Sequence, residues 1–215
     1  MSWIATDRFG ARTAPGGLAL VQEMVNTHAT ERGGVDLLAD AGSAGRWMRA
    51  AAEEWARAHG LEAPVLSLSP AGLEALRELR GTLNTMLAVP PGERLAGERL
   101  AGERLAGEQA AGPFRAGDLM THGPVQLASD LQGRVTLIPL GTDADWIVSA
   151  VWSEILLAQR GDEWSRIKLC RESGCRSAFY DGSRNGSATW HNVRTCGNMA
   201  NLRASRARRR GPQES

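Results

Sequence analysis

All three cysteines of the chain lie close together near its C-terminal end, with one of its four histidines. Four residues separate Cys170 from Cys175, and four separate His191 from Cys196. Two close pairs of sulfur and imidazole ligands fit the tetrahedral coordination of one Zn²⁺ ion. Because four protein ligands leave no position for water or substrate, the spacing predicts a structural zinc ion. Three buried free cysteines with a chance histidine are the alternative.

Glycines lie beside two of these ligands, at Gly174 and Gly197. We expect them to supply the open backbone angles of a tight turn around the metal. An odd number of cysteines leaves one thiol outside any closed disulfide framework, which also favours a metal.

A basic segment follows the last cysteine. Ala, Leu and Arg predict a helix over 197–210, with Arg203, Arg206 and Arg210 on one face and Arg208 and Arg209 beside it. Such a helix can present guanidinium groups to phosphates or to guanine edges.

The distribution of charge agrees with this interpretation. Residues 166–210 carry eleven Lys or Arg and two acids, whereas residues 1–165 carry fourteen bases and twenty-one acids. A basic module on an acidic body is typical of a protein that binds polyanions, although a solvated tail would look similar.

The elements that must position these residues are mainly helical. Apolar periodicity predicts helices over 18–29, 40–60, 69–89 and 143–159. Alternating residues predict a hairpin over 124–139 and a short strand over 164–169. Gly-Glu-Arg-Leu-Ala recurs over 92–112, which we interpret as an expanded surface segment. The predicted fold class is α+β: a mainly helical N-terminal domain with a small antiparallel sheet, then a zinc-finger module ending in a basic helix.

Several spaced motifs of the C-terminal part resemble the CGNR-type zinc finger of bacterial transcription regulators. They are Cys170-x4-Cys175, Phe179-x-Asp181, Ser183-Arg184-Asn185, Trp190-His191 and Cys196-Gly197-Asn198. The family usually has Cys where His191 stands and Arg where Met199 stands. Upstream, 18–20 and 25–27 resemble the start of the family's N-terminal ABATE domain. The resemblance implies an ABATE-like sensory or ligand-binding domain over 1–160 and a finger over 161–215.

The function predicted from these features is a DNA-binding transcription regulator, controlled by a ligand or stress signal at the N-terminal domain. The expected cofactor is one structural zinc ion, and DNA is the expected partner. A small-molecule effector and a homodimer are compatible with this reading. The candidate DNA contacts are Arg184, Asn185, Arg194, Asn198, Arg203, Arg206, Arg208, Arg209 and Arg210. A finger that docks on the transcription machinery, or one that binds RNA, are the alternatives.

Other classes of function find less support. The sequence shows no Gly-rich phosphate loop, no nucleophile elbow and no pair of acid–base residues, so we do not expect an enzyme. His28, His59 and His122 are expected to be structural or exposed rather than catalytic. No run of eighteen apolar residues predicts a membrane span, and a cytoplasmic location is expected.

Overall fold

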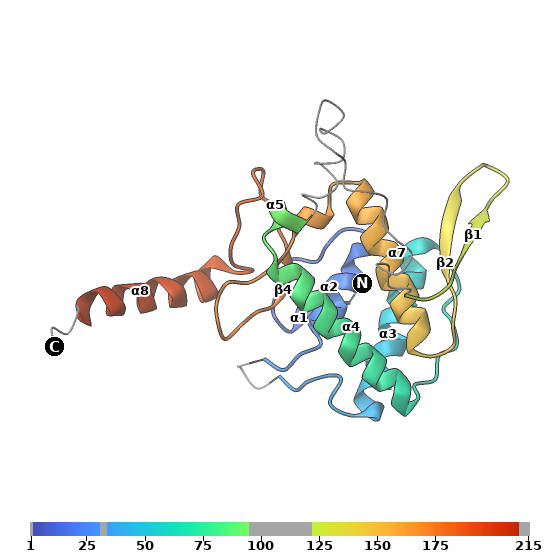
Figure 1. Ribbon diagram of the computed structural model, residues 1–215, viewed down its shortest axis with the longest axis horizontal. Coiled ribbons are helices and arrows are strands. Elements are labelled where there is room, and N and C mark those ends of the chain that lie inside the picture. Colours follow the sequence, from blue (N-terminus) through green and yellow to red (C-terminus); the bar gives the residue numbers. More distant parts are fainter. Residues whose placement is uncertain (1, 31–33, 95–121, 211–215) are drawn as a thin grey trace, which may run out of the picture.

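The computed structural model describes residues 2–30, 34–94 and 122–210, apart from the side chains at 207, 209 and 210. Its helical elements are α1 (Ile4–Asp7), α2 (Leu18–Val25), α3 (Ala41–His59), α4 (Pro70–Ala88), α5 (Pro91–Arg94), α7 (Ala144–Arg160), η3 (Trp164–Arg166), η4 (Val193–Gly197) and α8 (Asn198–Arg210). The strands are β1 (Val125–Ser129), β2 (Val135–Pro139), β3 (Ile167–Leu169) and β4 (Ala178–Tyr180). The predicted α+β class is confirmed: helices dominate, with two small antiparallel sheets (Figure 1).

Helix α2 lies at the centre of the molecule. All eight of its residues are buried, and it packs against α3, α4 and α7. A helix whose residues are apolar apart from Gln22 and Glu23 must be enclosed in this way. Its one acid, Glu23, accepts hydrogen bonds from the backbone of Ala5 (2.7 Å) and Thr6 (2.9 Å) and from Trp47 Nε1 (3.1 Å). The buried carboxylate therefore fixes α1 and α3 to α2.

The long helices begin and end where their capping residues predict. Asp40 accepts from the backbone N–H of Ser43, and Gly60 ends α3 in the left-handed region with φ 67°. Ser69 accepts from the backbone of Gly72 at the start of α4. Asp143 caps α7, and its side chain accepts from the backbone N–H of Ala144 (2.7 Å).

The first sheet is the predicted hairpin. Strands β1 and β2 pair antiparallel with Leu127 opposite Leu137. The second sheet pairs β3 with β4, Leu169 standing opposite Ala178. The strand expected over 164–169 is shorter in the structure, because Trp164–Arg166 form the turn η3 and only Ile167–Leu169 form β3. The sequence analysis did not predict β4.

One further prediction differs from the structure near the N-terminal end, and another is left untested. The helix expected over 18–29 ends at Val25, since Thr27 Oγ1 donates to Met24 O (2.8 Å) and Asn26 turns toward β4. Nearly all of the repeat at 92–112 lies outside the described residues. Its first residues belong to α5.

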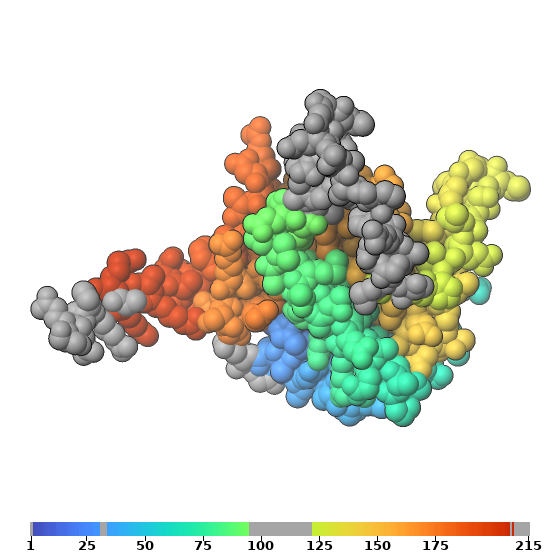
Figure 2. Space-filling model, viewed as in Figure 1, coloured from blue at the N-terminus to red at the C-terminus, as the bar shows by residue number. Residues whose placement is uncertain are grey.

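Two elements project from the helical body. The hairpin β1–β2 extends on one side and α8 on the other (Figure 2). The turn η4 runs directly into α8. None of the helices in the described part of the chain combines the length and apolar character needed to cross a bilayer.

Candidate metal centre and nucleic-acid interface

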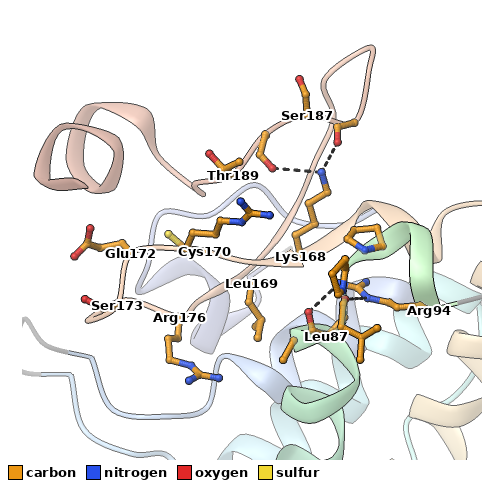
Figure 3. Close-up of a pocket in the computed structure, with 17 residues that line it drawn as sticks. Leu87, Arg94, Lys168, Leu169, Cys170, Glu172, Ser173, Arg176, Ser187 and Thr189 are labelled. Carbon is orange, nitrogen blue, oxygen red and sulfur yellow. Dashed lines mark hydrogen bonds between the residues drawn. The ribbon is translucent and has the colours of Figure 1, made fainter. Parts of the chain in front are cut away.

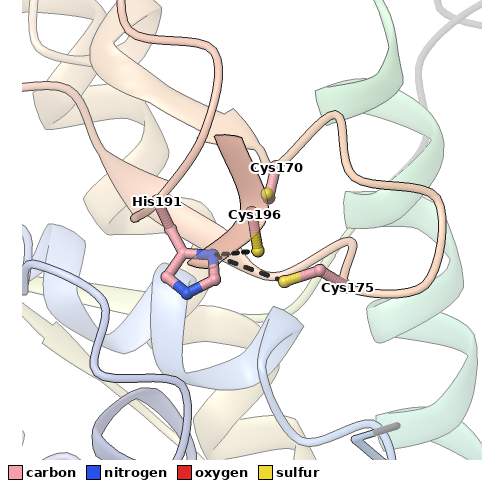
Figure 4. Close-up of side chains that lie close together, drawn as sticks. All are labelled: Cys170, Cys175, His191 and Cys196. Atoms are coloured by element: carbon pink, nitrogen blue, oxygen red, sulfur yellow. Dashed lines mark hydrogen bonds between the residues drawn. The ribbon is translucent and has the colours of Figure 1, made fainter. Parts of the chain in front are cut away.

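The hairpin β3–β4 positions the first pair of cysteines. Cys170 follows β3 directly, and its backbone N–H donates to Ser177 O (2.8 Å), which extends the ladder by one residue. The turn between them closes with bonds from the backbone of Cys175 (2.9 Å) and Arg176 (3.3 Å) to Glu172 O. This tight turn points both thiols to the same side of the hairpin (Figure 4).

The second pair of ligands is held by the turn that begins α8. Asn192 Oδ1 accepts from the backbone of Arg194 (2.9 Å) and Thr195 (3.3 Å), and so caps the turn η4. Cys196 lies within η4, and its backbone N–H donates to Asn192 O (3.0 Å). The capping amide therefore fixes His191 and Cys196 on either side of one turn.

The four side chains converge on one point. The ligand atoms of Cys170, Cys175, His191 and Cys196 all lie within 4.8 Å of one another. His191 Nδ1 lies 3.3 Å from the sulfur of Cys175 and 3.6 Å from that of Cys196 (Figure 4). A tetrahedral zinc ion with bonds of about 2.3 Å to sulfur sets its ligand atoms roughly 3.8 Å apart. The cluster therefore fits one structural zinc ion.

Zinc requires thiolates, and the surroundings of the three thiols are unequal. A hydrogen bond from Cys170 lowers the pKa of Cys175, and further bonds to His191 and Ser177 act in the same direction. The shared bond and burial raise the pKa of Cys170, and burial raises that of Cys196. Binding of zinc would require release of the protons that remain on these thiols.

The loop between the two pairs is organised by one buried carboxylate. Asp181 accepts from Lys168 Nζ (2.6 Å) and from the backbone of Ser183 (2.9 Å) and Ala188 (2.8 Å). Burial raises the pKa of Asp181, but these hydrogen bonds outweigh it and lower the pKa to about 2. The sequence placed this residue in a family motif without a role. In the structure it shapes the 181–189 loop.

The zinc cluster is joined to the helical body through the end of α2. Asn26 pairs with both backbone groups of Ala178, accepting from its N–H (2.7 Å) and donating to its carbonyl (3.0 Å). His28 Nε2 lies 3.2 Å from Cys175 O, so this side chain also contacts the cysteine turn. Phe9 packs edge-on against His191.

The predicted DNA contacts fall on three segments. Arg184 and Asn185 are exposed at the tip of the 181–189 loop. Arg194 is exposed on η4, where its carbonyl accepts from the Asn198 side chain (2.8 Å). The remaining arginines lie along α8.

The arginines of α8 differ in their surroundings. Arg203 donates to the buried carboxylate of Glu172 and to Ser173 Oγ (3.0 Å), so it anchors α8 to the cysteine turn. Arg206 and Arg208 are exposed. The side chains of Arg209 and Arg210 lie outside the described set.

The expectation for the two glycines is wrong. Among the described residues beside the metal ligands, the positive φ belongs to Arg176, at 49°, and to neither Gly174 nor Gly197. Gly197 lies close to its neighbours instead, since a Cβ there would lie 3.3 Å from the side chain of Val193 and 3.5 Å from that of Trp190. The α8 turn thereby packs closely on the Trp190 ring.

One comparison with known proteins agrees with this geometry. The family model of the CGNR zinc finger matches residues 166–209, which include all four ligands of the cluster. A comparison with curated proteins finds no match to the chain.

Proposed function

We propose that the chain is a DNA-binding transcription regulator in which one structural zinc ion fixes the base of α8. The observation that supports this most strongly is the arrangement of α8 itself. The helix leaves the body, begins at a zinc-ligand turn and exposes Arg206 and Arg208 (Figure 2). A helix of this width fits the major groove of DNA.

The proposal gives zinc a structural role and no catalytic one. Cys170, Cys175, His191 and Cys196 complete a tetrahedron, and a closed tetrahedron has no place for a substrate. The ion instead joins the cysteine turn to η4, and Arg203 adds a second link through Glu172. Without zinc, the base of α8 is held by few apolar contacts, and we expect the helix to lose its fixed direction.

The test is an equilibrium titration of the full chain with a labelled duplex over a range of salt concentrations. We expect log K to fall linearly with log salt. Replacing both Arg206 and Arg208 with Ala should weaken binding by roughly tenfold or more and reduce the slope by roughly 2. The matched control replaces Arg46 and Arg49, two exposed arginines of α3, and should leave both quantities unchanged.

Chelation of zinc is the second test of the proposed function. Removal of zinc should abolish duplex binding, and added zinc should restore it. DNA binding that survives complete loss of zinc, or a flat salt response, would contradict the proposal. RNA that outcompetes the duplex at equal length would identify an RNA-binding protein instead. Sequencing the genomic fragments that the protein retains would then define its target.

A further inference from the structure

A cavity of about 640 Å³ lies between the end of α4 and the zinc module (Figure 3). Strand β3 packs beside α4 here, so the cavity has one wall from the helical body and one from the cysteine hairpin. Its volume lies within the range of pockets that enclose small organic ligands. It is separate from the four metal ligands except for Cys170, which contributes to its lining.

The wall from the helical body is apolar. It consists of the run Leu87, Ala88, Val89, Pro90 and Pro91 at the end of α4. The polar groups of this run are already paired, since Arg94 donates to the carbonyls of Leu87 (2.9 Å) and Val89 (2.8 Å). Arg94 also donates to Ile167 O (2.7 Å) and Trp164 O (3.4 Å), so backbone carbonyls occupy four of its five N–H groups. This wall therefore offers hydrocarbon surface to a ligand.

The opposite wall is cationic. Lys168 is occupied by Asp181 and by carbonyls of the 181–189 loop. Arg171 and Arg176 are exposed, and neither side chain forms a hydrogen bond or ion pair with any residue in the described part of the chain. The one acid in the lining, Glu172, is buried and paired with Arg203. Among the residues that the structure describes, no free acid compensates these two guanidinium groups of the lining.

We propose that this cavity binds a small organic anion with an apolar body. The anionic group would accept charge-assisted hydrogen bonds from Arg171 or Arg176, and the body would lie against Val89 and the two prolines. A phosphodiester backbone matches this site less well, because it would leave the apolar wall uncovered. Glu172 and Ser173, at the rim of the cavity, also hold Arg203 of α8. An occupied cavity would therefore act on the base of α8. That regulatory consequence rests on the proposed function, whereas ligand binding does not.

The probe is 8-anilinonaphthalene-1-sulfonate, an organic anion whose fluorescence rises in apolar surroundings. Titrated into the zinc-loaded full chain, it should bind saturably at one site. Arg171→Glu with Arg176→Glu should weaken binding at least about tenfold, through lost charge-assisted bonds and added repulsion. The charge-matched control, Arg46→Glu with Arg49→Glu on α3, should bind as the natural protein does. Zinc content and the far-ultraviolet spectrum check the fold of each variant.

The apolar wall is tested separately. Val89→Asp should weaken binding of the probe roughly fivefold or more. Val65→Asp, at a side chain that is 94% exposed, should leave binding unchanged. Leu127→Asp on the projecting hairpin should also have no effect. The proposal is overturned by a lack of saturable binding, by an Arg171/Arg176 or Val89 variant that binds the probe as tightly as the natural protein, or by a loss only in Leu127→Asp. Displacement of the probe by short duplex DNA would indicate that Arg171 and Arg176 bind DNA and not a small anion. Loss of DNA binding in the Arg206/Arg208 variant with retained probe binding would leave this proposal intact and concern α8 alone.

Discussion

Asn26 is the residue that joins the helical body to the zinc hairpin. Its amide pairs with both backbone groups of Ala178, and its nitrogen also lies 3.3 Å from Thr6 Oγ1. The side chain is fully buried. A buried amide with all its partners in place contributes more than its hydrogen bonds alone, because each partner would otherwise be buried without one.

Replacing Asn26 with Ala should therefore destabilise the whole chain. The Ala178 N–H would lose its partner, and we expect the free energy of unfolding to fall by about 2–3 kcal/mol. Urea denaturation followed by tryptophan fluorescence measures this. Asn84→Ala is the control, since Asn84 donates only to Arg80 O in its own helix, and it should change stability by less than about 1 kcal/mol. Equal losses in the two variants would contradict the role assigned to Asn26.

At the residue scale, the sequence predicts what depends on local spacing. Cys170, Cys175, His191 and Cys196 are identified by two short intervals, and the structure brings all four together. Asn26 escapes such reasoning because its partner Ala178 is 152 positions away. A lone asparagine at a helix end is ordinary in sequence. Only the fold shows that it pairs with a strand.

At the scale of elements, the sequence predicts that α8 is a helix but does not predict which of its arginines contacts the rest of the protein. Composition predicts the helix, and the structure places it over Asn198–Arg210. Periodicity puts Arg203 and Arg206 among equivalent cations, yet only Arg203 reaches the Glu172 carboxylate. The difference arises from the turn at 170–175, whose carboxylate cannot be located without knowing how the hairpin closes.

The two arginines should consequently respond differently to the same substitution. Arg203→Ala leaves the buried Glu172 without its cation, and we expect the release of zinc to a chromogenic chelator to accelerate about threefold or more. The effect is moderated because the Arg203 side chain is 54% exposed. Arg206→Ala removes the same charge from the same helix and should release zinc at the natural rate. Indistinguishable rates for the two would refute the anchoring role.

At the scale of the whole molecule, a buried ion pair joins α3 to α7. His59 Nε2 lies 3.0 Å from the Glu154 carboxylate, and His59 Nδ1 lies 2.8 Å from Trp55 O. Both ring nitrogens therefore face acceptors, as an imidazolium requires. Gly17 makes room for this pair, since a Cβ there would come within 2.0 Å of Glu154 Oε1.

The pair predicts how stability depends on pH. Burial lowers the pKa of His59, but the bonds to Glu154 and to the Trp55 carbonyl raise it above the ordinary 6.5. The contribution of the His59–Glu154 pair to stability is complete below the unfolded-state pKa of His59. It is lost as pH rises through the folded-state pKa of this residue. The free energy of unfolding of the natural protein should be higher than that of His59→Gln by about 1–2 kcal/mol near pH 6. This difference should shrink toward roughly pH 9. Thermal melts at matched zinc measure it. A difference that grows with pH would contradict the assignment.

The division of the chain is the feature that the sequence leaves most open. A boundary near residue 160 stays a prediction. The buried core that contains α2 and α7 also includes Trp164, Ile167 and Ala178, so it continues into the zinc module. Charge and cysteine content change sharply at this point of the sequence, whereas apolar packing does not. The composition of a segment indicates its surface charge and its metal ligands. It does not indicate which apolar side chains contact one another in the fold.

The attachment of α8 has a mechanical consequence. Thirteen residues at about 1.5 Å each make a rod about 20 Å long, held at one end by η4 and by Arg203. A tilt of about 10° at that pivot would carry the far end through roughly 3 Å, about the length of one hydrogen bond. The rod thus amplifies small displacements. A change too slight to alter the zinc tetrahedron could still move Arg208 into or out of register with a row of phosphates.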